Sequence, residues 1–402
     1  MGRNKLIQKT FFCADPACCG CAACSNACPK QCLEMLPNND GFSYPIVDLA
    51  MCVDCGLCDK VCPVLHPFSE KEPVTTIAAI NKNDEVRRRS SSGGFFYALA
   101  ELVISRNGVV FGASFDEHWN VCIDYTDNME EVKNFQGAKY VQAEIGKSYI
   151  QVRTYLKEGR WVLYTGLPCQ ISGLKHYLNH DYENLITAEC VCHSVPSPKV
   201  WRSYLNSVSE GRTIKDINFR NKDKGWSHYG YQMVINFENG ESFKASSSNV
   251  YIQGLVHNLT VRPSCAQCTA KNGRSRADYS MGDYWGVWDL QPKMDDNNGT
   301  SIVVVQTRKA VDLLSKLNVN VESANLEGAR KYNIGLDKST PLHHKHEVFF
   351  RNIEKCPTEK LLSKYLNDTN QIKSFIRKIW NYRRKFFEFY LTINISSRSN
   401  SQ

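Results

Sequence analysis

Beyond residue 73, segments with a strand-like pattern of hydrophobic and polar residues alternate with segments that have a helix-like pattern. Short apolar runs bounded by turn residues predict strands at 109–115, 121–125, 161–165, 185–192 and 302–306. Amphipathic segments predict five helices. In chain order, they run from residue 95 to Asn107-Gly108, over 145–157, from about residue 169, over 198–208, and from after 306 to about 317. Segments 231–237 and 242–245, joined across Asn239-Gly240, predict a hairpin. This alternation predicts an α/β or α+β core.

The first 66 residues show a different pattern, a duplicated run of cysteines. The spacing C-x2-C-x2-C-x3-C-P occurs twice, ending at Pro29 and at Pro63, with a predicted turn at Asp40-Gly41 between the two halves. This spacing is typical of bacterial two-cluster ferredoxins, in which the fourth cysteine of each run ligates the cluster of the other run. One [4Fe–4S] cluster is therefore assigned to Cys18, Cys21, Cys24 and Cys62, and the other to Cys28, Cys52, Cys55 and Cys58.

Zinc knuckles and disulfide bonds fit these cysteines less well than clusters do. Zinc knuckles need only two C-x2-C pairs and do not explain the repeated proline. Disulfide frameworks belong to small secreted chains, whereas this chain has 402 residues and no apolar segment of signal-peptide length at its start. We therefore expect a cytoplasmic protein without a transmembrane segment.

Composition adds little to this picture apart from the 18 cysteines. The net charge of +8 is modest and local, so no nucleic-acid partner is expected. The predicted organisation is a ferredoxin-type domain over 1–66, two further regions over 67–158 and 159–330, and a basic aromatic helical tail over 331–402, partly disordered. A tail of this kind either packs on its own domain or makes peripheral membrane contact.

Further cysteines stand at positions suited to a third metal centre. Cys169 follows Gly-Leu-Pro at a predicted helix start, where the helix dipole favours a thiolate. Cys265 and Cys268 form a C-x2-C pair, and Cys190 or Cys192 would supply the fourth ligand from a strand end. Zinc would use the same ligands, and scattered buried cysteines are the simpler alternative. No role is assigned to the remaining cysteines, which are Cys13, Cys19, Cys32, Cys122 and Cys356.

Several motifs together resemble the coenzyme F420 hydrogenase/dehydrogenase beta-subunit family. They are SSSGGFFYALA, QGAKYVQ, GLPCQISGL, CVCHSVPSP, FRNKDKGW, RPSCAQC and GDYWG, which occur in family order over about residues 1–290. The resemblance implies a mixed α/β flavin-binding core, FAD and a third [4Fe–4S] cluster on Cys169, Cys192, Cys265 and Cys268. It also implies that residues 67–158 form the flavin-side region and that residues 159–330 form the core with the third cluster.

The resemblance also implies positions for the flavin. It would lie near Ser91, Ser92, Gly93 and Gly94, a loop whose free N–H groups at a helix start suit a phosphate but which also serves as an ordinary N-cap. Lys139 and Tyr140 match a second flavin-side motif, in which Ala138 replaces the usual serine. Arg220, Lys222 and Trp226 would bind the pyrophosphate or an anionic substrate, unless they are solvated strand-edge groups. Asp283 and Trp285 are placed near the third cluster, and the run with His343, His344 and His346 is interpreted as a polar loop.

These features predict an iron–sulfur flavoprotein oxidoreductase. Electrons would pass from a ferredoxin or another redox partner through the clusters to FAD, and on to a small-molecule acceptor of unknown identity. Two alternatives remain open: an electron-transfer subunit without a substrate site of its own, and a module whose clusters are mainly structural.

Overall fold

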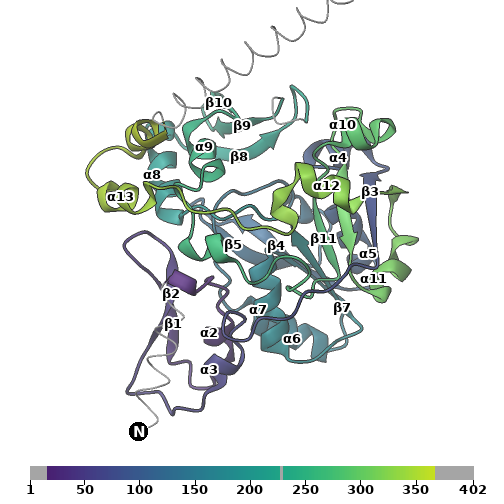
Figure 1. The fold of residues 1–402 in the computed structure, drawn as a ribbon, viewed down its shortest axis with the longest axis horizontal. Helices are drawn as coiled ribbons and strands as arrows, with labels where there is room; N and C mark the ends of the chain where they lie inside the picture. The colour runs from purple at the N-terminus through teal and green to yellow at the C-terminus, as the bar shows by residue number, and fades with distance from the viewer. Residues whose placement is uncertain (1–15, 227–229, 367–402) are drawn as a thin grey trace, which may run out of the picture.

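The computed structural model describes residues 16–226 and 230–366. Its centre is an eight-stranded mixed sheet with the order β13-β3-β12-β11-β7-β6-β4-β5 (Figure 1). These strands are β3 (Thr75–Asn81), β4 (Val109–Phe115), β5 (Val121–Thr126), β6 (Val162–Gly166), β7 (Leu185–Cys190), β11 (Tyr279–Asp283), β12 (Ser301–Val305) and β13 (Val319–Ser323). Strands β4, β6, β7 and β11 are parallel to one another, and the outer pairs are antiparallel.

Helices cover both faces of this sheet, because its central strands are apolar on both sides. Helix α5 (Phe95–Ile104) and α11 (Arg308–Leu314) pack on one face, and α6 (Ser148–Lys157) and α7 (Pro168–Leu178) on the other. Strand β12 is buried at all five positions. The remaining helices are α4 (Asp84–Arg89), α8 (Pro198–Ser209), α9 (Val250–Val256), α10 (Val287–Leu290), α12 (Leu326–Tyr332) and α13 (His346–Asn352), with 3-10 turns η2 (Val132–Asn134), η3 (Pro263–Gln267), η4 (Pro292–Met294) and η5 (Ile334–Leu336).

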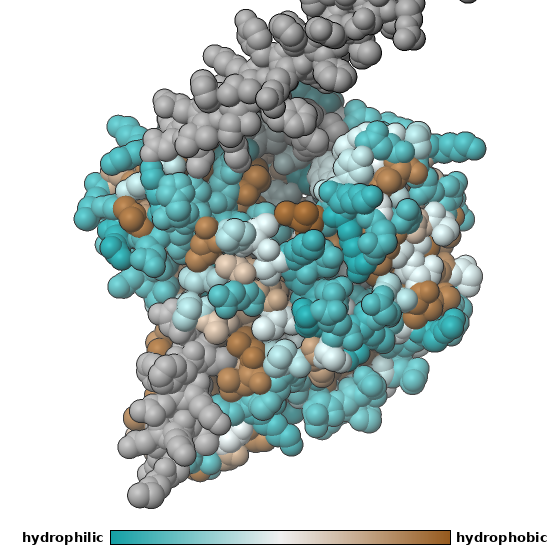
Figure 2. Space-filling model, viewed as in Figure 1, coloured by the Kyte–Doolittle hydropathy of each residue, from teal (hydrophilic) through white to brown (hydrophobic). Residues whose placement is uncertain are grey.

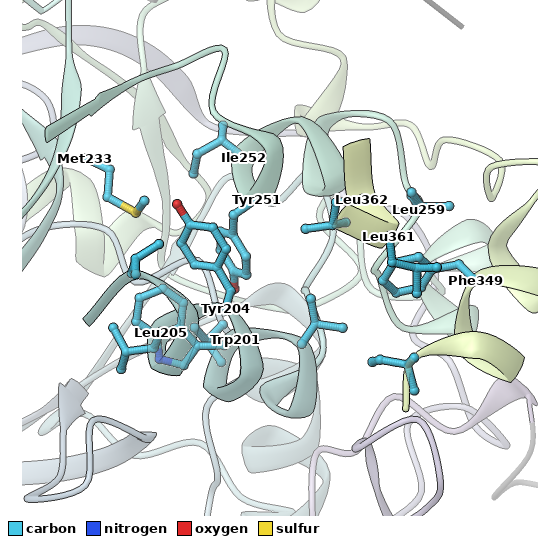
Figure 3. Packing of buried hydrophobic residues seen from close by; sticks show 14 of the residues in the cluster. Trp201, Tyr204, Leu205, Met233, Tyr251, Ile252, Leu259, Phe349, Leu361 and Leu362 are labelled. Atoms are coloured by element: carbon cyan, nitrogen blue, oxygen red, sulfur yellow. The ribbon is translucent and has the colours of Figure 1, made fainter. Parts of the chain in front are cut away.

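A second, antiparallel sheet consists of β8 (Ile214–Asn221), β9 (Gln232–Phe237) and β10 (Ser242–Ser246), in the order β10-β9-β8. It shares a hydrophobic cluster with α8, α9 and α13 (Figure 3). Phe349, Leu361 and Leu362 contribute to this cluster and are at most 2% exposed. The segment up to residue 366, which the sequence assigned to a separate tail, therefore packs into the core. The basic aromatic helix expected at 371–391 lies outside the described residues.

The cysteine-rich unit, residues 16–66, lies at one end of the molecule (Figure 1). It contains the antiparallel strands β1 (Leu33–Pro37) and β2 (Ser43–Val47) and the short helices α2 (Ala23–Ala27) and α3 (Leu57–Lys60). The predicted Asp40-Gly41 turn joins its two strands. This turn contacts the core, because Ser197 Oγ at the N-terminus of α8 donates to the Asp40 carbonyl at 2.5 Å.

The predicted mixture of helices and strands is confirmed, with small differences at element ends. The predicted strand 185–192 ends at Cys190, and the predicted helix 145–157 begins at Ser148. Strands β3, β8, β11 and β13 were not predicted. These strands are defined by their pairing: β3 pairs with β12 and β13, β8 with β9, and β11 with β7 and β12. Among residues 16–226 and 230–366, every helix is too short or too polar to cross a bilayer.

Candidate metal centres and flavin site

The two cysteine runs of the cysteine-rich unit form two separate cavities. One is lined by the inner set, which we define as Cys18, Cys21, Cys24 and Cys62, together with Cys19 and Cys58. The other is lined by the outer set, which we define as Cys28, Cys52, Cys55 and Cys58, together with Cys32. The fourth cysteine of each run thus lies with the first three of the other run, as the ligand exchange of two-cluster ferredoxins requires.

The backbone of both runs follows the same local path. The residue before the second cysteine of each run has positive φ, 71° at Gly20 and 56° at Asp54. The residue after it is also left-handed, with φ 57° at Ala22 and 73° at Gly56, and it begins the short helix without a side-chain cap. The N–H groups at these two helix starts are therefore not used by a capping side chain.

A third group of cysteines comes from three separate parts of the core. Cys169 lies at the N-terminus of α7, Cys192 follows β7, and Cys265 and Cys268 lie in and directly after η3. We call these four the core set. The Cys169 thiol interacts electrostatically with Cys268 and Cys192, and the Cys192 thiol with Cys265 and Cys268. Within the described residues, no three His, Cys, Asp or Glu side chains are arranged around one point as ligands of a single metal ion.

Burial changes the acidity of these thiols. It raises the pKa of Cys18 and of Cys265 to about 11, so neither thiol alone is anionic at neutral pH. A coordinating metal removes the proton from such a thiol outright. Cys190, the alternative fourth ligand, interacts with Glu189, Asp283 and Lys139, and within the core set with Cys192.

Cys19 is a site residue that the cysteine spacing did not identify. Its side chain hydrogen-bonds to Cys169 of the core set and to Cys21 of the inner set. It occupies one of the two spacer positions in C-x2-C, where any residue satisfies the motif, so only the tertiary structure reveals its position. Helix α2 packs on α7 at the same place, and a Cβ at Gly173 would lie 2.9 Å from the Cys21 Sγ. The inner set and the core set are therefore neighbours.

The residues assigned to the flavin come together at the start of α5. The Ser91 Oγ accepts from the Ala138 N–H at 2.6 Å, which connects the SSGG loop to the segment with Lys139 and Tyr140. Gly94 begins α5 with φ 84° and no side-chain cap. The Gly93 N–H, however, donates to the Ser301 Oγ at 3.0 Å and is not free for a phosphate.

Two of the three basic side chains in this region already have protein partners. Arg220, which is 4% exposed, pairs with Asp283 at 2.9 Å and donates to the Tyr140 hydroxyl at 3.1 Å. Lys222 Nζ donates to the carbonyls of Arg87, Ser92 and Asn298, and burial lowers its pKa to about 7.

Lys139 differs from these two. Among the described residues, the hydrogen-bond partners of its Nζ are the carbonyls of Gln136 at 3.2 Å and Gly137 at 3.5 Å. Burial lowers the pKa of Lys139 to about 8. It is thus the cation of this region with the weakest protein partners.

Aromatic residues lie around the Arg220–Asp283 pair. The guanidinium lies 4.1 Å from the Tyr231 ring centre and 5.3 Å from that of Trp285. Trp226 stacks on Trp285 at 5.1 Å and donates its indole N–H to Asp283 at 3.0 Å. Asp283, Trp226 and Trp285 are therefore held in place by contacts with one another and with Arg220.

The histidine run lies apart from these groups. His343 and His344 stack with ring centres 4.4 Å apart, and His346 Nε2 lies 2.7 Å from the Val261 carbonyl. Burial lowers the pKa of His343 to about 4 and keeps it neutral.

Comparisons with known proteins agree with this division of the chain. Residues 159–327 match the family model described as coenzyme F420 hydrogenase/dehydrogenase, C terminus of the beta subunit, and residues 17–65 match that of a 4Fe-4S dicluster domain. A solved structure of the F420-reducing [NiFe] hydrogenase complex from Methanosarcina barkeri aligns over 76% of this chain and 94% of its own, with 15% identity and a TM-score of 0.44.

Curated relatives match parts of the chain. An F(420)H(2) dehydrogenase subunit of Methanosarcina mazei is 22% identical over 162 residues, 38% of this chain and 46% of the relative. An uncharacterized polyferredoxin-like protein of Methanocaldococcus jannaschii is 34% identical over 76 residues, 17% of this chain and 44% of the relative. The chain thus spans less than half the length of these two relatives. It joins a region that matches a 4Fe-4S dicluster domain to a region that matches the C terminus of the coenzyme F420 hydrogenase/dehydrogenase beta subunit.

Proposed function

We propose that this protein transfers electrons from a one-electron carrier through three [4Fe–4S] clusters to FAD, and from there to a small acceptor. The observation that supports this order is the contact between α2 and α7, which brings the inner set beside the core set through Cys19. FAD, when bound, would exchange single electrons on one side and a hydride on the other. The outer set, the inner set and the core set would then hold successive clusters.

The core set has the chemistry of a cluster site. Its four cysteines come from three segments and interact electrostatically with one another, and thiolates are the ligands that iron–sulfur clusters use. Burial disfavours these thiolates in the protein alone, and a bound metal centre would remove their protons.

The proposed flavin site rests on the loop Ser91–Gly94 together with Lys139, Tyr140 and Arg220. Ser92 Oγ donates to the Thr300 carbonyl and the Gly93 N–H donates to the Ser301 Oγ, so the start of β12 holds this loop in place. Lys139 remains as the cation that would contact a flavin phosphate. Lys222 donates to three carbonyls, one of them that of Ser92, and would therefore stabilise the loop without contacting the flavin.

One observation favours the second candidate, an electron-transfer subunit without its own substrate site. Arg220 and Lys222, the residues assigned to an anionic substrate, are both occupied by protein groups. A separate catalytic subunit would then receive the electrons. Turnover of an acceptor by the isolated chain distinguishes the two candidates.

The electron carrier would approach the outer set. Cys55 is exposed, and so are the large apolar residues around it, which include Met51 and Val53 at 51% and 53% exposure. Hydrophobic residues are visible on this end of the molecule in Figure 2. Apolar surface beside an exposed cluster suits a redox partner protein, for which a ferredoxin is our proposal.

The central test is the composition of protein purified without oxygen. We expect about 12 iron atoms and one FAD for each chain, given four irons in each cluster. Cys268→Ser should reduce the iron to about 8 atoms, whereas Cys356→Ser, at an exposed cysteine, should leave it unchanged. About 8 iron atoms in the unmodified protein would contradict the third cluster.

The flavin site has its own test, based on pH. Lys139 should lose its charge as pH rises through about 8, so FAD affinity should fall above that pH. Lys139→Met should weaken FAD binding about tenfold below pH 8 and abolish the pH dependence, because a charge-assisted hydrogen bond contributes roughly 1.5–3 kcal/mol. Lys133→Met, at an exposed lysine of the same segment, is the matched control. Equal FAD affinity of the two variants would refute the assignment.

A further inference from the structure

Arg262 is buried at the junction of the cysteine-rich unit and the core. It is 1% exposed and lies three residues before Cys265 of the core set. Its Nε donates to the Cys18 carbonyl at 2.7 Å and its Nη2 to the Ser43 carbonyl at 3.0 Å. Its Nη1 donates to the Gln142 Oε1 at 3.0 Å. One side chain of the core thus holds two segments of the cysteine-rich unit.

The charge of Arg262 has no carboxylate partner. Among the described residues, no Asp or Glu oxygen lies within 4.0 Å of its guanidinium, whereas the buried Arg87 and Arg220 each pair with an aspartate. Arginine does not lose its proton in proteins, and an unpaired buried charge is strongly unfavourable. Tyr44, at 4.3 Å, and Phe42, at 5.5 Å, face the guanidinium, but cation–π contacts offset only part of this cost.

Thiol groups take the place of the missing carboxylate. Arg262 interacts electrostatically with Cys18 of the inner set and with Cys265 of the core set. It also acts on Cys19, which lies between the two sets. The chain leaves room for this arrangement at Gly20, where a Cβ would lie 2.8 Å from the Arg262 Nη1.

We propose that Arg262 is a positioning residue whose positive charge is shared by the inner and the core metal centres. Its counter-charge is the thiolates of these two centres, an inference that rests on the proposed clusters. A fixed positive charge stabilises the more negative, reduced form of a cluster, so both centres should have higher reduction potentials than they would without it. The outer set does not contact Arg262 and should be unaffected.

The test is a redox titration of the full chain, purified without oxygen and followed by EPR and visible absorption. Arg262→Gln should shift the reduction equilibrium of two of the three clusters about tenfold toward the oxidised form, about 59 mV for a one-electron couple. Arg262→Lys keeps the charge and should restore most of the shift. Arg212→Gln, which removes a partly buried arginine that stacks on Phe237 in the second sheet, is the matched control and should shift none of the clusters.

Each outcome decides the proposal. Unchanged potentials in Arg262→Gln, or equal shifts in the Gln and Lys variants, would overturn the role of the charge. If the Arg262→Gln variant loses iron, the iron content of the Arg262→Lys variant decides between the two explanations. Iron retained in the Lys variant supports the role of the positive charge, whereas iron lost in it indicates that Arg262 acts through packing alone. Unmodified protein with only about 8 iron atoms would refute the third cluster, and with it the shared role, before any variant is made.

Discussion

The two halves of the cysteine-rich unit have the same motif and the same backbone turns but different surroundings. Helix α2 of the first half packs on α7, and Cys21 is buried there. Helix α3 of the second half has no buried residue, and Cys55 is exposed. Equivalent positions carry different residues: Cys19, beside Cys169, corresponds to Val53, which is 53% exposed. One local motif therefore provides a contact with the core in one copy and an exposed surface in the other.

The contact between the first half and the core should be the easiest to break. Gly173→Val would place side-chain atoms where a Cβ alone already lies 2.9 Å from the Cys21 Sγ. We expect a loss of about 1–3 kcal/mol in the free energy of unfolding, the typical cost of overpacking. Electron transfer from the inner to the core cluster should slow as well. Chemical unfolding and stopped-flow reduction measure these effects.

The control for this change lies in the second half. Gly56 has a left-handed backbone with φ 73°, and nothing lies within 4 Å of a Cβ built on it. Gly56→Ala should cost about 1 kcal/mol from its backbone conformation alone and should leave transfer to the core unchanged. Similar transfer rates in Gly173→Val and unmodified protein would show that the packing of α2 on α7 does not matter for transfer.

Exchanging the equivalent residues should give an intermediate effect. Cys19→Val introduces the residue of the second half and removes the hydrogen bonds to Cys169 and Cys21. Hydrogen bonds to cluster sulfurs raise reduction potentials, so the core cluster should become harder to reduce, by up to about tenfold in equilibrium. Cys32→Val, at the extra thiol beside the outer set, should affect the outer cluster alone. A redox titration that shows the reverse pattern would contradict the comparison.

The smallest effect is expected on the exposed side of the second half. Val53→Asp should reduce the rate of reduction by a ferredoxin severalfold, because it places a charge in an apolar docking surface. Reduction by dithionite, which needs no such surface, should not change. Stability should change by less than about 0.5 kcal/mol, as is typical of surface positions. Val348→Asp, at an exposed valine of α13, serves as the control.

Local patterns predicted much of the secondary structure. Strand β4 has the bounds expected from the run at 109–115, and α5 begins directly after the SSGG loop. Apolar periodicity and glycine turns act within a few residues, so they can be read without knowledge of the fold. Strands β3 and β11 were missed because each depends on neighbours far away in the sequence, such as β12.

The candidate sites show the same limit. The family motifs placed Lys139, Arg220 and Lys222 in one group, and the structure brings their segments together around the SSGG loop. The motifs did not show that Arg220 and Lys222 have protein partners or that Lys139 lacks a strong one. Those differences arise from carbonyls and carboxylates in other segments, such as Asn298 and Asp283.

The sequence by itself determined the two cysteine runs and the exchange of their fourth cysteines, because short spacers restrict where a thiol can lie. The tertiary structure alone decided which run faces the core, where Cys19 lies, and which buried charge lies between the two groups of thiols. These depend on α7, on the hairpin β1-β2 and on Arg262, which are distant in the chain and meet only when their apolar faces are buried together.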